Sequence, residues 1–141
     1  MRNTRLETIF PNLRPTGYEI TSQESTRYNC VGWALHDTAK SWWPRRGYFW
    51  PEDSQDESVE EFIRMFTGQG YEVCAKTEHE EGYEKIAIYC RDGTPSHVAR
   101  QLPSGLWTSK CGDYHDITHS LDGFKGSSHG EATVIMRRSA R

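Results

Sequence analysis

The feature that most constrains the fold is a succession of strand-like segments joined by short turns in the second half of the chain. Residues 83–91 form the strongest segment, because apolar side chains alternate between its two faces. Turn residues at 91–95 lead to a second segment at 97–102, and a Pro-Ser-Gly turn leads to a third at 106–110. Turns this short join antiparallel neighbours, so the pattern predicts an antiparallel β-meander.

Two helices are expected ahead of this meander. Asn29 is a favoured N-cap, and apolar residues at helical spacing follow it, which predicts a helix over about residues 29–39. Ser58 opens a capping box, and an apolar stripe continues from it to about residue 68. The sequence therefore predicts a second, clearer helix at this point.

The remaining segments complete the expected organisation. Residues 1–25 are interpreted as an irregular N-terminal arm, and further strands are expected at 71–76 and 132–138. A long polar stretch with several glycines covers residues 111–130. Helices followed by strands indicate an α+β fold, so we expect one domain over residues 1–141, with two N-terminal helices packed on an antiparallel meander.

Composition narrows the classes of function. The formal net charge of −3 provides no basic excess to neutralise phosphates, so nucleic acid is not expected as a partner. No apolar run approaches the roughly 20 residues of a membrane helix, and no apolar export segment follows the first residues, which favours a cytoplasmic protein without a membrane partner. The four cysteines lie far apart and are expected as free thiols.

A cysteine and a histidine stand at positions suited to catalysis. Cys30 follows the expected N-cap Asn29, where the positive end of the helix dipole favours a thiolate. His97 opens an expected strand, from which its imidazole could reach the helix end. A thiol paired with an imidazole is the minimal apparatus of a cysteine nucleophile, so the pair predicts covalent catalysis.

A third residue must orient the imidazole of such a pair by accepting its second N–H. Asp116 is the favoured candidate, because it follows the next strand and is anchored by Ile117. His119 is the next candidate for this role. The hypothesis is therefore a Cys30–His97–Asp116 site, with His119 in support.

These residues carry a resemblance to known families. A Tyr-Asn-Cys-x-x-Trp-Ala helix start, a later strand that opens with His, and a polar residue after the next strand resemble the papain-like or NlpC/P60-like cysteine hydrolases. The chain is also similar to an uncharacterised bacterial family without known activity. The motifs shared with that family cover residues 29–34, 85–89, 97–102, 107–112 and 116–119.

The papain-like resemblance implies a fold, a reaction and roles for individual residues. Cys30 would be the nucleophile, His97 the base and Asp116 the orienting residue, with a thioester intermediate formed from an amide or ester of a peptide, protein or small-molecule substrate. The oxyanion would be held by the Cys30 backbone N–H with Asn29 as a second donor, because Gln23 stands one position too early for the papain glutamine. No cofactor is implied, and substrate contacts are expected from four residues: Trp33, Trp43, Arg100 and Gln101.

Two other functions compete with the hydrolase. His115 and His119 stand four residues apart, and on a helix they could share a zinc ion as in a zinc hydrolase. Residues 42–50 form a loop with five aromatic side chains and two arginines, which could serve a binding module without chemistry. The alternative for this loop is that it packs on the sheet as part of the core.

Overall fold

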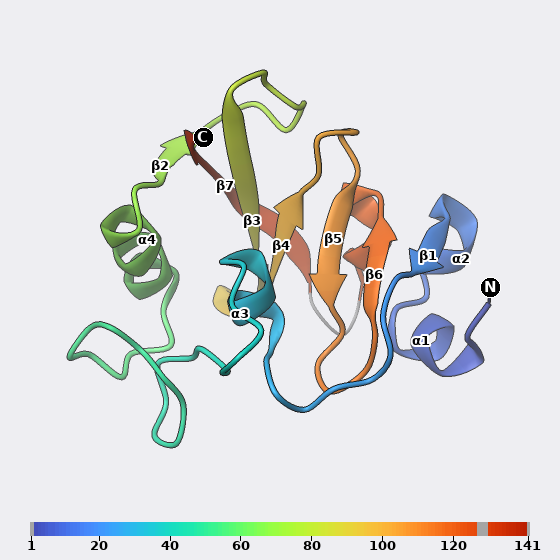
Figure 1. Cartoon of the computed structure of the whole chain (residues 1–141), viewed down its shortest axis with the longest axis horizontal. Coiled ribbons are helices and arrows are strands. Elements are labelled where there is room, and N and C mark those ends of the chain that lie inside the picture. The colour runs from blue at the N-terminus through green and yellow to red at the C-terminus, as the bar shows by residue number, and fades with distance from the viewer. Residues whose placement is uncertain (1, 127–129, 141) are drawn as a thin grey trace.

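The computed structural model describes residues 2–126 and 130–140 and contains a seven-stranded antiparallel sheet. The strands follow one another across the sheet in the order β1-β6-β5-β4-β3-β7-β2 (Figure 1). This architecture confirms the α+β class and the antiparallel sheet. The strands are β1 (Tyr18–Ile20), β2 (Glu72–Cys74), β3 (Tyr83–Arg91), β4 (Thr94–Gln101), β5 (Trp107–Lys110), β6 (Asp116–His119) and β7 (Glu131–Ser139).

Strands β3 to β6 form the expected meander, because each pairs with the next along the chain. The β3–β4 hairpin turns at Asp92 and Gly93, whose φ values of 52° and 80° are those of the turn that Asp-Gly sequences favour. Strand β7 then crosses back to pair with β3. The meander is thus extended on both sides, by β7 and β2 at one edge and by β1 at the other.

The two expected helices are present, but the first is shorter than predicted. Helix α3 (Cys30–Ala34) is capped by Asn29, and it ends before His36, whose φ of 61° is left-handed. Helix α4 (Val59–Gly68) begins at Ser58, whose hydroxyl accepts the Glu61 N–H as the capping box predicts. Both helices cover the same face of the sheet, α3 over β4 and β5 and α4 beside β2 and β3 (Figure 1).

The N-terminal arm and the polar stretch at 111–130 contain more structure than expected. The arm forms α1 (Thr4–Ile9), α2 (Leu13–Thr16) and strand β1, and the polar stretch holds β6 and the 3-10 helix η1 (Leu121–Phe124). These elements are only three to six residues long, too short for their apolar pattern to distinguish them from loop. They are ordered by burial, since Leu6, Leu13 and Phe124 are each at most 1% exposed.

The sheet separates two hydrophobic cores. On one face Ile86, Ile88 and Val98 pack beneath α3 and α4, and we call this the α3-face core. On the other face Ala87 and Tyr89 belong to a core closed by α1, α2 and η1, which we call the η1-face core. Burial on both faces explains why the middle of β3, from Ile86 to Cys90, is apolar without a break.

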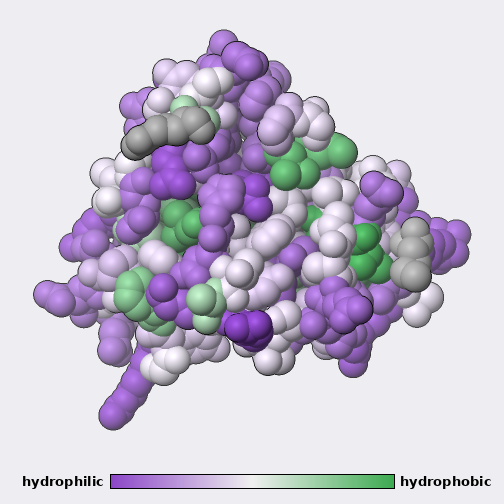
Figure 2. Space-filling model, in the orientation of Figure 1, coloured by the Kyte–Doolittle hydropathy of each residue, from purple (hydrophilic) through white to green (hydrophobic). Residues whose placement is uncertain are grey.

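The outer surface of the α3 side is mostly hydrophilic, with small separate hydrophobic patches (Figure 2). Within residues 2–126 and 130–140, no helix is both long enough and apolar enough to span a membrane.

Candidate functional site

Cys30 occupies the first turn of α3, as the sequence predicts, but its side chain is buried. The residue is 8% exposed and belongs to the α3-face core. Burial raises the pKa of the Cys30 thiol to about 11, and the backbone N–H groups of Val98, Val31 and Cys30 itself offset only part of that effect. The thiol form is therefore favoured at neutral pH, although the sulfur lies against the β4 backbone next to His97.

The imidazole of His97 lies on the opposite face of the sheet from Cys30. Val98 packs in the α3-face core, whereas the His97 ring lies 4.4 Å from the ring of Phe124 in the η1-face core. The expected Cys30–His97 pair is thus not formed in this structure. The reason is the alternation of side chains along β4, which directs adjacent residues to opposite faces.

His97 belongs instead to a buried chain of hydrogen bonds. Its Nε2 lies 2.8 Å from the Ser109 hydroxyl, which lies 2.7 Å from Nε2 of His119. The His119 Nδ1–H donates to the Ser120 carbonyl at 2.6 Å, so its Nε2 must accept the Ser109 hydroxyl proton. His97 then donates its Nε2–H to Ser109.

Burial keeps this chain away from solvent and holds His119 in its neutral form. It lowers the pKa of His119 to about 4, because the desolvation outweighs the effect of the hydrogen bond to the Ser120 carbonyl. His97, Ser109 and His119 are at most 1% exposed. His119 therefore supports His97 through Ser109, as part of the η1-face core, and does not reach Cys30.

Asp116 lies on the α3 face but orients a tyrosine, not the histidine. Its Oδ2 accepts the Tyr28 hydroxyl at 2.8 Å, and its backbone N–H donates to the Ser22 hydroxyl at 2.9 Å. Burial raises the pKa of the Asp116 carboxyl, and its Oδ1 has no hydrogen-bond partner among the described residues. The predicted Asp116–His97 contact is wrong, because the two side chains lie on opposite faces of the sheet.

Lys110 completes this polar cluster and was not singled out from the sequence. Its Nζ donates to the carbonyls of Ser25 and Gly112 and lies 5.1 Å from the Tyr28 ring centre. Its side chain is fully buried, and this burial lowers the pKa of the ammonium group. Lys110 and Asp116 are directly opposite each other on β5 and β6. A prediction of the register between these two strands would have identified the pair.

The Asn29 side chain joins α3 to the aromatic loop instead of supporting an oxyanion. Its Oδ1 accepts the backbone N–H of Gly32 at 3.1 Å and of Trp42 at 3.0 Å, and its Nδ2 donates to the Trp42 carbonyl at 2.7 Å. The loop can lie this close to α3 because residue 32 is a glycine. A Cβ at that position would lie only 2.7 Å from the backbone oxygen of Lys40, just ahead of the loop. The loop is thus seated directly on the start of α3.

The aromatic side chains of residues 42–50 divide between packing and exposure. Trp42 is buried in the α3-face core, and Trp50 packs on Phe62. Tyr48 and Phe49 remain 46% and 42% exposed. The loop therefore contributes both to the core and to an accessible aromatic surface.

Tyr48 and Phe49 line a pocket of about 520 Å³, which we call the aromatic-loop pocket. One wall is the loop itself, including Trp43, and the opposite wall is the segment ahead of α3 together with the β5–β6 turn. The lining residues are Thr26, Asn29, Lys40, Ser41, Trp43, Arg45, Gly47, Tyr48, Phe49, Gly112 and Asp113.

The other expected substrate contacts lie away from this pocket. Trp33 donates its indole N–H to the Thr108 hydroxyl at 2.9 Å, and the Arg100 guanidinium lies 5.1 Å from the Trp33 ring centre. Gln101, on the opposite face, donates to the Thr77 carbonyl. Of the four residues predicted to contact substrate, only Trp43 lines the aromatic-loop pocket.

The two histidines of the zinc hypothesis do not converge. Residues 116–119 form a strand, along which four positions span about 13 Å. His115 bonds the Ser22 carbonyl, whereas His119 is committed to the buried chain. Over the described ranges, no group of three or more His, Cys, Asp or Glu side chains could hold a metal ion.

The fold and the site together define an α+β protein with a ligand-sized pocket over the start of α3. The chain belongs to the family described as Domain of unknown function (DUF7689), which matches residues 19–137. No curated protein and no solved structure matches the chain.

Proposed function

We propose that the chain is a binding module that recognises a peptide segment in the aromatic-loop pocket. The observation that carries this proposal is the exposure of Tyr48 and Phe49 on the wall of a pocket of about 520 Å³. Pockets of this size that combine apolar side chains with a few polar groups are typical ligand sites.

The charges around the pocket favour a ligand without a large charge. Lys40 is paired with Asp37 at 2.9 Å, and Arg45 is paired with Glu57 at 2.7 Å. Both cations are thus already neutralised, while Asp113 adds a carboxylate to the lining. Among the described residues of the lining, both cations are already paired and neither is free for a polyanion. A peptide can instead use its backbone amides on the polar wall and a side chain on the aromatic wall.

The pocket is also held in shape before any ligand arrives. Asn29 ties Trp42 to α3, and the Trp43 indole donates to Glu57 at 2.8 Å, the same carboxylate that Arg45 binds. Ordering a loop on binding weakens affinity, so a fixed wall favours recognition.

The test is a two-dimensional amide NMR titration with N-acetyl phenylalanine amide and N-acetyl alanine amide. The aromatic probe should shift the resonances of the pocket lining and bind more tightly than the alanine probe. Tyr48→Ala should weaken this binding by about tenfold, since a buried aromatic contact contributes roughly 1 kcal/mol beyond its area. Leu106→Ala is the matched control, because Leu106 is 48% exposed and lies outside the pocket.

Equal binding of the two probes, or equal losses in the two variants, would contradict recognition by the aromatic wall. Shifts that map away from the pocket would place the ligand elsewhere.

A second candidate is acyl transfer by Cys30 in a papain-like fold, favoured by the three backbone N–H groups that act on its sulfur. Such groups stabilise a thiolate once it forms. This reaction needs a base on the α3 face, and Lys110, which interacts electrostatically with Cys30, would replace His97. Alkylation of the thiols, described below, tests this candidate independently of ligand binding.

A further inference from the structure

A second pocket lies at the ends of β3, β4 and β7, away from the aromatic loop. Its volume is about 390 Å³. Pro103 and Ala140 give it an apolar wall, and Arg100 reaches it from β4. Tyr83 also lines the pocket, but its ring lies 4.3 Å from the Arg137 guanidinium on the opposite face of the sheet from Arg100. We call it the Arg100 pocket.

Arg100 brings to this pocket a cation that forms no ion pair with any carboxylate of the described residues. Its Nε donates to the Trp33 carbonyl at 3.3 Å, and its guanidinium lies over the Trp33 ring. Among the described residues, the two terminal nitrogens have no hydrogen bond and no ion pair. Tyr71, Glu84 and Asp116 act on the guanidinium only at longer range, and burial lowers its pKa without neutralising it.

The acidic residues of the pocket set a limit on the charge of a ligand. Glu84 forms an ion pair with Arg138 at 3.4 Å and lies 3.2 Å from the His36 imidazole, so Arg138 balances part of its charge. Glu81 also lines the pocket. A dianion would therefore be repelled more strongly than a monoanion, while the guanidinium fork matches the two oxygens of one carboxylate.

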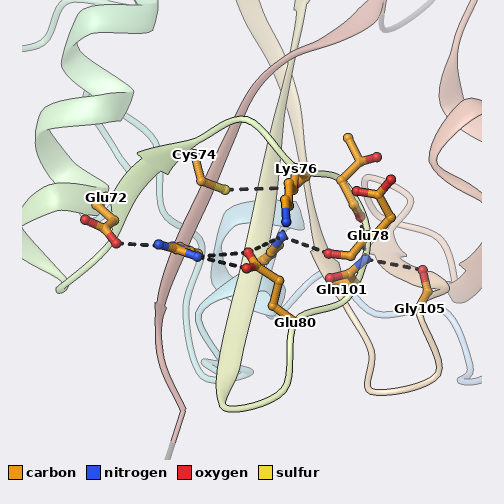
Figure 3. Close-up of polar contacts among 10 residues, drawn as sticks. Glu72, Cys74, Lys76, Glu78, Glu80, Gln101 and Gly105 are labelled. Atoms are coloured by element: carbon orange, nitrogen blue, oxygen red, sulfur yellow. Dashed lines mark hydrogen bonds and ion pairs between the residues drawn. The ribbon is translucent and has the colours of Figure 1, made fainter.

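A polar network holds the β2–β3 loop, which contributes His79 and Glu81 to the lining of the Arg100 pocket (Figure 3). Gln101 donates to the carbonyls of Thr77 at 2.8 Å and Gly105 at 3.4 Å, which joins the β2–β3 loop to the β4–β5 turn. The buried Lys85 donates to the carbonyls of Lys76 and Glu78 in the same loop, both at 2.8 Å. The loop that carries the pocket residue His79 is thus held in place.

We propose that the Arg100 pocket binds a small organic monocarboxylate with an aromatic or apolar group. The carboxylate pairs with the terminal nitrogens of Arg100, and the apolar group lies against Pro103 and Ala140. This site is separate from the aromatic-loop pocket, so it does not depend on the proposed function.

The test is an amide NMR titration with three probes: benzoate, its neutral isostere benzamide, and inorganic phosphate. Benzoate should shift the amides of Tyr83 and Ala140 and bind at least about tenfold more tightly than benzamide, because a hydrogen bond to a charged group is worth more than a neutral one. Phosphate should bind more weakly than benzoate.

Arg100→Gln should abolish the preference for benzoate over benzamide, and Arg100→Lys, which keeps the charge without the fork, should retain only part of it. Arg91→Gln is the control, because Arg91 is an exposed arginine at the far end of β3. Equal binding of benzoate and benzamide, tighter binding of phosphate, or unchanged benzoate binding in folded Arg100→Gln would each overturn the proposal.

Discussion

Replacement of Asn29 by alanine should destabilise the protein well beyond the loss of a helix cap. Asn29 makes one hydrogen bond to the α3 backbone at Gly32 and two to the backbone of Trp42. An N-cap contributes about 1 kcal/mol. Each of the other two bonds contributes about 1 kcal/mol, since Asn29 is only partly buried and water can replace it in part.

The expected loss for Asn29→Ala is therefore about 3 kcal/mol of unfolding free energy. Asn29→Ser keeps a capping hydroxyl but is too short to reach Trp42, so it should lose about 2 kcal/mol. Ser58→Ala is the matched control, because the Ser58 hydroxyl caps α4 through one bond to Glu61 and should cost only about 1 kcal/mol.

Urea denaturation followed by tryptophan fluorescence measures these differences. With a slope of about 2 kcal/mol/M, the midpoint should fall by about 1.5 M for Asn29→Ala and by about 0.5 M for Ser58→Ala. Hydrogen exchange should show faster exchange of the Trp42 and Trp43 amides in Asn29→Ala than in Ser58→Ala. Equal midpoint shifts for the two variants would show that the bonds to Trp42 contribute no stability. In that case Asn29 would not hold the aromatic-loop pocket in shape.

The burial of His119 and of three of the cysteines sets how the protein responds to pH and to alkylation. The fold lowers the pKa of His119 from 6.5 to about 4, so the unfolded chain binds the proton more tightly than the folded one. The contribution of His119 to the free energy of unfolding is therefore fully present well above pH 6.5 and falls as the pH drops toward 4. The loss at pH 5 should be about 2 kcal/mol relative to pH 8, and His119→Gln should remove it. An unchanged slope in that variant would assign the proton uptake to another group. Iodoacetamide at pH 8 should label the partly exposed Cys74 before the buried Cys30, Cys90 and Cys111, as read by mass spectrometry of tryptic peptides. Preferential labelling of Cys30 would instead support the acyl-transfer candidate.

Strands and caps were predictable because their signals are local. The Asp92–Gly93 turn fixes the β3–β4 hairpin, and the Ser58 capping box fixes the start of α4. Asn29 likewise caps a helix where the sequence predicts one. In each case the determining residues are neighbours along the chain, so no tertiary contact is needed to recognise them.

The relation between Cys30 and His97 could not be predicted from such signals. Cys30 reaches the β4 backbone at Val98, so the sequence places the helix start against the correct strand. The face to which His97 points depends on the phase of the strand, and one residue of phase moves a side chain through the sheet. Both faces of β4 are buried in apolar surroundings, so the hydrophobic pattern does not reveal that phase.

The cover over the η1-face core has a consequence for any recombinant fragment of this protein. The family match begins at residue 19, whereas Leu6, Phe10 and Leu13 of the preceding segment are nearly inaccessible to solvent. A fragment trimmed to residues 19–137 would remove these side chains and leave the ring of Phe124, which stacks on Phe10 at 4.4 Å, facing water. For this chain the boundary drawn by sequence similarity is therefore not the boundary of the folding unit, and fragments for expression should retain α1 and α2.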